Sequence, residues 1–159
     1  MKNIVNFCLA VLFISGVSAC SHEPTSRKFT GEYMIIGPGG GFRPPVGTYY
    51  YLSSTQLLAD TAVILYNPPS DISLFKFDSV LPAAKHAAVK DVLTAIPSEI
   101  LRNNHGEFGI STVAVDGGYT VIRTKVNGIH YDWKFHDKLD NASAEVKQFM
   151  GKVKVVFIK

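Results

Sequence analysis

The sequence predicts an α+β fold: an antiparallel sheet of about five to six strands with two helices packed on one face. Strand-like runs follow one another as hairpins, while the two helical patterns stand apart from them, which disfavours alternating β-α-β units. The clearest element is a hairpin over residues 119–135, where Asn127-Gly128 separates two alternating runs. Asn-Gly favours a type I′ turn because both central residues need a positive φ. We therefore expect the sheet to be organised around this hairpin.

The register expected for this hairpin gives it one apolar and one polar face. The apolar face contains the opposed pairs Val126–Ile129, Thr124–Tyr131, Ile122–Trp133 and Thr120–Phe135. The polar face contains the opposed pairs Lys125–His130, Arg123–Asp132 and Val121–Lys134. Opposite charges at Arg123 and Asp132 support this register independently. A slip of one residue would turn Trp133 to water, so the apolar face is expected to meet the core.

Further short strands are expected on either side of a glycine-rich segment. They cover residues 33–36, 48–52, 56–58, 61–66, 72–77 and 108–115. Residues 53–55 are expected to turn the second of these strands back into the third. The glycine-rich segment Gly37–Pro45 contains prolines as well as glycines, which excludes a helix or a central strand there.

Two amphipathic helices are predicted. The first covers residues 83–96 after Pro82, which suits a first helical turn, and residues 98–101 add one turn beyond Pro97. Its expected apolar positions are Val89, Val92, Leu93 and Ile96. The second helix begins near Ala144, with Asn141 or Ser143 as its cap, and residues 154–158 either extend it or form a strand. Its expected apolar positions are Val146, Phe149, Met150 and Val153.

Residues 1–19 have the pattern of a bacterial lipoprotein signal peptide. A short basic start precedes an apolar run that is too short to span a bilayer. Val17-Ser18-Ala19-Cys20 then resembles the lipobox, in which an aliphatic residue and two small residues precede the acylated cysteine. We therefore expect lipid on Cys20, a tether over residues 20–30 and one globular domain over residues 31–159, held at a membrane of the bacterial envelope. The alternative is ordinary secretory cleavage after a small residue.

Cysteine use and charge exclude several classes of function. Cys8 would leave with the signal peptide and Cys20 would be lipidated, so no cysteine nucleophile, thiolate metal site or redox pair would remain. The net charge is +3, from 16 basic and 13 acidic residues, which gives no basis for nucleic-acid binding. The remaining chain of about 140 residues is long enough to bury one hydrophobic core.

The sequence contains no recognisable motif for catalysis or cofactor binding. Gly37-Pro-Gly-Gly-Gly-Phe42 matches neither a dinucleotide fingerprint nor a phosphate loop, and no serine lies in G-x-S-x-G. His130, Asp132 and His136 would point to the same side of a strand, but a straight strand would separate the two histidines by roughly 20 Å. A zinc site usually needs three or four converging ligands. We therefore predict no catalytic residue, no metal and no cofactor.

Aromatic and arginine side chains are the candidate binding residues. Phe42 and Arg43 follow three glycines and precede two prolines, so their loop is expected to project from the sheet toward a protein partner. Tyr49 and Tyr51 point to the same side of a strand and are expected to neighbour that loop. The alternative for these aromatic side chains is burial against the core.

The segment Ile35-Ile-Gly-Pro-Gly-Gly-Gly-Phe42, followed by an aromatic strand, resembles small bacterial envelope lipoproteins that open with a Gly-Gly-Gly-Phe segment. The chain is also similar to the emfourin family of metalloprotease inhibitors. That family has a Gly-Gly-Phe turn, then an Asp-Gly strand region, here Asp116-Gly-Gly-Tyr119, and a terminal helix. The resemblance covers most of residues 33–153 and implies protease inhibition. Arg43-Pro44-Pro45 stands where that family has a small glycine, and no inhibitory residue carries over.

These features predict a lipid-anchored envelope protein that binds another macromolecule without catalysis. The lipid would reach the membrane, and the expected partner is a protein of the envelope. A protease inhibitor is the first alternative, because inhibition is a specialised form of protein binding. An envelope hydrolase or accessory enzyme is the second, because catalytic residues distant in sequence can converge in a fold.

Overall fold

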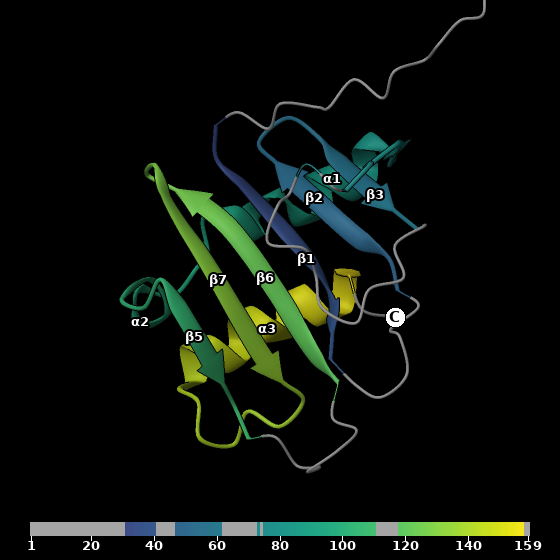
Figure 1. Ribbon diagram of the computed structural model, residues 1–159. Coiled ribbons are helices and arrows are strands. Elements are labelled where there is room, and N and C mark those ends of the chain that lie inside the picture. The colour runs from purple at the N-terminus through teal and green to yellow at the C-terminus, as the bar shows by residue number, and fades with distance from the viewer. Residues whose placement is uncertain (1–30, 41–46, 62–72, 74, 111–117, 158–159) are drawn as a thin grey trace, which may run out of the picture.

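The computed structural model describes residues 31–40, 47–61, 73, 75–110 and 118–157, apart from the side chain of Val156. This part of the chain forms a seven-stranded sheet with α3 packed across one face (Figure 1). The strands are β1 (Tyr33–Gly39), β2 (Tyr49–Ser53), β3 (Leu57–Asp60), β4 (Ser79–Val80), β5 (His105–Phe108), β6 (Tyr119–Val126) and β7 (Ile129–His136). The helices are α1 (Ala83–Val89), the 3₁₀ turn η2 (Lys90–Leu93), α2 (Ser98–Leu101) and α3 (Ala144–Phe157). The predicted α+β class is confirmed, although strands and helices exceed the expected numbers.

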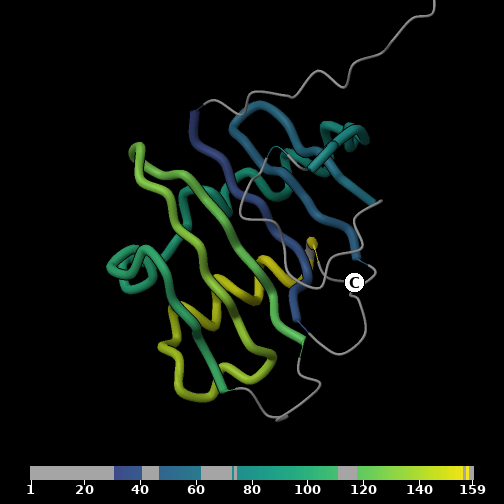
Figure 2. The backbone as a smooth tube through the Cα atoms, in the orientation of Figure 1, coloured from purple at the N-terminus to yellow at the C-terminus, as the bar shows by residue number. Residues whose placement is uncertain are grey.

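The sheet is mixed rather than antiparallel, which corrects the prediction from the sequence. Its strand order is β4-β3-β2-β1-β6-β7-β5, and every pairing is antiparallel except that of β5 with β7. Strand β5 precedes β6 in the chain but pairs with β7 on its far side, as Figure 2 shows. Segments that are consecutive in sequence are therefore not neighbours at this edge of the sheet.

The hairpin of β6 and β7 has the predicted register. The predicted pairs are all present: Val126–Ile129, Lys125–His130, Thr124–Tyr131, Arg123–Asp132, Ile122–Trp133, Val121–Lys134 and Thr120–Phe135. Asn127 and Gly128 have φ values of 50° and 80°, as a type I′ turn requires. Trp133 and Phe135 are fully buried, whereas Lys134 between them is exposed. The predicted facing of β7 is therefore confirmed.

The main hydrophobic core lies between the sheet and α3, which crosses behind β7, β6 and β1 in Figure 1. The predicted apolar positions of α3 are all buried: Val146, Phe149, Met150 and Val153. The Val146 N–H donates a hydrogen bond to Ser143 Oγ at 3.3 Å, so Ser143 rather than Asn141 caps the helix. The helix continues to Phe157, whose ring centroid lies 5.2 Å from that of Tyr50. The open choice at this end of the chain is thus settled as helix up to Phe157.

The first helical segment is shorter than predicted. Helix α1 ends at Val89, and the chain continues as the 3₁₀ turn η2 instead of an α-helix to Ile96. Proline disfavours helical geometry at the residue before it, so Pro97 accounts for the end of helical geometry near Ile96, whereas nothing in the structure explains why α1 already ends at Val89. The unwound segment still buries Val89 and Val92 in the core, and it leaves Leu93 and Ile96 half-buried. Helix α2 is the extra turn that was expected after Pro97.

Strand β1 runs through Gly37-Pro38-Gly39 in the middle of the sheet, which corrects the prediction that this segment excludes a central strand. It pairs with β6 along its whole length, but its pairing with β2 ends at Ile36. Pro38 therefore lies where β1 is locally an edge strand, a position that tolerates proline. A Cβ on Gly37 would lie 2.2 Å from Tyr49 Cδ1, so the glycine leaves room for a tyrosine ring from the next strand.

Gly37→Ala is expected to lower the free energy of unfolding by about 1–3 kcal/mol, because the added Cβ would overlap the Tyr49 ring. Gly151→Ala in α3 is a matched control of opposite sign. A Cβ at Gly151 meets no atom within 4 Å, and alanine favours a helix over glycine by up to about 1 kcal/mol. Denaturant titration measures both changes. An unchanged free energy of unfolding in Gly37→Ala would mean that the Tyr49 ring moves aside without cost.

A second apolar cluster lies on the sheet face opposite α3, over β1, β2 and β3. Its buried members are Tyr33, Ile35, Tyr49, Tyr51, Leu58, Phe75 and Phe77. The strand predicted over residues 72–77 is wrong for Phe75–Phe77, which has no regular structure and a φ of 41° at Phe77; residues 72 and 74 lie outside the described residues. The Lys76 N–H donates a hydrogen bond to the buried Asp60 carboxylate at 2.7 Å. This bond holds the segment over β3.

The remaining strand predictions differ at their ends. The strand expected over residues 108–115 lies earlier, as β5, and Gly109 ends it with a φ of 93°. Ile110 then forms an isolated bridge with Lys138, and residues 111–115 lie outside the described residues. Of the strand expected over residues 61–66, all but Thr61 lies outside them too. Strand β4, which pairs with β3, was not predicted because it has only two residues.

Candidate functional site

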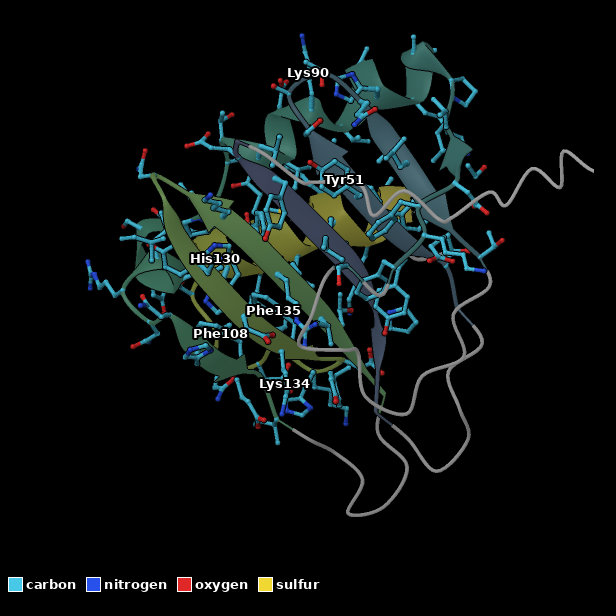
Figure 3. All side chains as sticks on the ribbon, turned by 45° about the horizontal axis from the view of Figure 1, so that its top comes forward. Tyr51, Lys90, Phe108, His130, Lys134 and Phe135 are labelled. Carbon is cyan, nitrogen blue, oxygen red and sulfur yellow. The ribbon has the colours of Figure 1, made fainter. Side chains whose placement is uncertain are left out.

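A cluster of charged side chains lies beside the second apolar cluster, on the same face of the sheet. It belongs to β6, β7 and β5 and surrounds an open cavity of about 540 Å³. We call this site the charged groove, and its residues are His105, Gly106, Glu107, Tyr119, Val121, Arg123, Asp132 and Lys134. Figure 3 views the molecule from this side, with His130 and Lys134 toward opposite ends of β7.

Cross-strand register places the charges of the groove in rows. One row contains Arg123 of β6, Asp132 of β7 and His105 of β5. The next row contains Val121, Lys134 and Glu107 from the same three strands. Because alternate residues of a strand face the same side, each row contains one pair of opposite charges, and the acidic Asp132 and the basic Lys134 follow each other along β7.

The first ion pair forms the floor of the groove. Arg123 Nε donates a hydrogen bond to Asp132 Oδ2 at 3.0 Å. The Arg123 side chain is only 12% exposed, whereas that of Asp132 is 38% exposed. Partial burial reduces solvent screening, so this pair is held more firmly than a pair on an open surface.

The second ion pair lies at the edge of the sheet. Lys134 Nζ donates a hydrogen bond to Glu107 Oε1 at 2.9 Å, and His136 Nε2 lies 3.6 Å from the other carboxylate oxygen. The hydrogen bond and charge of Lys134 hold the pKa of Glu107 below its ordinary value, and the hydrogen bond that Lys134 donates to Glu107 raises the pKa of Lys134. The Lys134 ammonium also lies 5.5 Å from the centroid of the Tyr119 ring. One lysine thus connects an acid with an aromatic ring.

Lys134→Ala is expected to raise the pKa of Glu107 toward its ordinary value of 4.5, because its main stabilising partner is removed. A lowered pKa stabilises the folded state above the unfolded value, and that contribution is lost as pH falls through the folded pKa. The carboxylate is 58% exposed, so the pKa itself, followed by NMR titration, is the better measurement. Lys152→Ala on α3 is the control. An unchanged Glu107 pKa in Lys134→Ala would contradict the ion pair.

The paired charges suit recognition better than acid–base catalysis. A general acid or base works best with a pKa near the operating pH, and Lys134 moves the pKa of Glu107 away from it. The described residues that line the groove include no serine, threonine or cysteine that could act as a nucleophile. Over the described ranges, no three His, Cys, Asp or Glu side chains lie close enough together to hold a metal ion. The groove therefore presents two ion pairs, Arg123–Asp132 and Lys134–Glu107, on this face of the sheet.

The structure buries the two tyrosines that were predicted to neighbour a binding loop. Tyr49 and Tyr51 are 1% and 3% exposed. Their rings pack on Phe75 and Phe77, with centroids 4.9 and 5.6 Å away respectively. Burial raises the pKa of Tyr49 to about 12, and its hydroxyl donates a hydrogen bond to the Pro38 carbonyl. Both tyrosines therefore contribute to packing in this structure.

The other predicted site residues, Phe42, Arg43 and Cys20, lie outside the described residues, so their roles stay predictions. Asp132 pairs with Arg123 as the sequence indicated, rather than with a neighbouring histidine. His130 has its Nδ1 3.4 Å from the Tyr33 hydroxyl. The histidines and the aspartate of β7 thus have separate partners.

Residues of β5 complete the groove, and sequence reasoning did not place them there. The alternation of β6 and β7 predicted that Arg123, Asp132 and Lys134 share a face. His105 and Glu107 join them only because β5 pairs in parallel with β7. The one signal that could have indicated this neighbour is the opposite charge of Glu107 and Lys134, and such pairs are too common in sequences to identify a partner.

The fold and the groove define a small α+β domain with helices on one sheet face and a charged surface on the other. No protein-family model matches the chain, and searches among curated proteins and solved structures find no significant match either. Within the described residues, no helix has the length and apolar character that a membrane crossing requires.

Proposed function

We propose that this protein is a lipid-anchored lipoprotein of the bacterial envelope that binds another macromolecule through the charged groove, without catalysis. The lipobox-like Val17–Cys20 and the apolar run before it support the anchor. The alternating charges of the groove support the binding role. The expected partner is a protein that presents acidic and basic side chains in the complementary order.

The observation that carries the binding role is the pair of cross-strand ion pairs, Arg123–Asp132 and Lys134–Glu107, on three adjacent strands. Side chains already held by neighbours lose little freedom when a partner binds, which lowers the entropic cost of association. Complementary charge patterns also speed encounter and reject wrong partners. Two adjacent cross-strand ion pairs are thus suited to selective protein binding.

Exchange of the charges in Glu107→Lys with Lys134→Glu tests the proposal. The double variant keeps an ion pair at the same site and the same net charge, but it reverses the order of the charges. Crosslinking in intact membranes should recover a partner with the wild-type protein. We expect recovery to fall by about tenfold or more with the exchange, because like charges would then face each other across the interface.

Lys152→Glu is the matched control, because Lys152 is exposed on α3, on the opposite side of the sheet. It should recover the partner at the wild-type level. Denaturant titration verifies that the exchanged variant is folded. A folded exchange variant that retains the partner in full would contradict the groove as the binding surface. If the recovered partner is a protease and this protein inhibits it, the protein is the protease inhibitor that the emfourin resemblance implies.

A further inference from the structure

A second cavity, of about 560 Å³, lies at the glycine-rich end of β1, between the sheet and the helices α1 and α3. Its described lining includes five glycines: Gly37, Gly39, Gly40, Gly47 and Gly118. Its size is within the range of small-molecule sites in proteins. The cavity is separate from the charged groove except at Tyr119, which lines both.

Apolar side chains form much of the wall of this cavity. Val89 of α1 and Phe157 of α3 line the cavity and belong to the main core, and at 1% and 6% exposure they close its inner end and present little surface to it. Tyr50 of β2 packs on Phe157, and Val155 adds an exposed apolar side chain. A wall of this kind favours an apolar chain or ring over a polar ligand.

The charge beside this apolar wall is positive. Lys85, Ala88 and Val89 lie on one side of α1 at spacings of three and four residues, and all three line the cavity. Among the described lining residues, the other charged one is Asp137, which has a carboxylate oxygen 3.9 Å from Lys154 Nζ. Lys85 forms no ion pair within the described ranges, so its ammonium is available to an anion.

We propose that this cavity binds a single-chain amphiphile with one carboxylate, of the size of a medium-chain fatty acid. The chain lies against Tyr50, Val89 and Phe157, and the carboxylate pairs with Lys85. The inference does not depend on the charged groove or on a lipid anchor. It follows from an apolar wall of suitable size with one available cation beside it.

Photoreactive dodecanoate, added to membranes that contain the full-length protein, tests this site. We expect adducts on the peptides that contain Tyr50, Val89 or Phe157, and free dodecanoate should compete for them. Lys85→Glu should lower this labelling by about tenfold, because attraction becomes repulsion in a partly apolar site. Ala88→Trp should lower it to background by filling the cavity. Lys90→Glu, at an exposed position outside the cavity, should label as the wild type does.

Lys85 and Ala88 are exposed, so both variants are expected to fold, and thermal unfolding verifies this. Adducts elsewhere in the chain measure non-specific partitioning and serve as the internal reference. Labelling of the cavity peptides at the wild-type level in both variants would overturn the proposal. Equal labelling by a cationic dodecyl probe, or equal competition by a two-chain phospholipid, would also overturn it. Adducts found only outside the peptides that contain Tyr50, Val89 or Phe157 would overturn the proposal as well.

Discussion

Trp133→Ala is expected to lower the free energy of unfolding by about 3–5 kcal/mol. The indole is fully buried in the main core, and its ring centroid lies 5.1 Å from that of Tyr131. Its Nε1–H also donates a hydrogen bond to the Asn103 carbonyl at 2.8 Å. The substitution therefore removes core packing and a link between β7 and the segment before β5. Denaturant titration of the purified protein measures the loss.

Two variants separate these contributions. Trp133→Phe keeps an aromatic ring but leaves the Asn103 carbonyl without its donor, so about 1–3 kcal/mol should be lost. Lys125→Ala lies on the other face of the same hairpin and should change stability by no more than about 0.5 kcal/mol. Equal losses at positions 133 and 125 would contradict the facing of the hairpin.

The hairpin could be predicted in detail because independent local signals agree within it. The Asn127-Gly128 turn, the apolar alternation and the opposed charges of Arg123 and Asp132 all require the same register. A strand pairing decided by residues a few positions apart leaves few alternatives. The apolar face of α3 could be predicted for the same reason, since its burial follows the helical period.

The corrected elements depend on residues far apart in the chain. Gly37-Pro38-Gly39 has poor strand propensity by itself, but β6 pairs with it and the rings of Tyr49 and Tyr119 lie where side chains of those glycines would be. The position of β5 likewise depends on β7 rather than on its own few residues. The local sequence pattern could not predict these contacts, because tertiary packing overrides strand propensity in both cases.

The candidate site likewise combines residues whose placement could be predicted from the sequence with residues whose placement could not. Its hairpin charges could be predicted to share a face, whereas Glu107 and the second ion pair required the position of β5. Aromatic content suggested surface roles for Tyr49 and Tyr51, but the structure packs them beneath Phe75 and Phe77. The sequence of an aromatic strand is the same whether or not a distant segment covers that strand. The burial of Tyr49 and Tyr51 could therefore not be predicted from their strand alone.

Cys20→Ala is expected to abolish acyl labelling and stable membrane attachment of the protein. The lipobox-like segment offers this one thiol at the position that is acylated in bacterial lipoproteins. Stable anchoring takes more than one acyl chain, and a diacylated cysteine would supply them together, so attachment should be lost outright rather than weakened. Metabolic labelling with a fatty-acid analogue, followed by membrane fractionation, measures both effects. Cys8→Ala is the matched control and should label normally, because Cys8 precedes the expected cleavage site. Unchanged labelling of Cys20→Ala would refute the lipoprotein proposal, and loss in both variants would point to a defect in export instead.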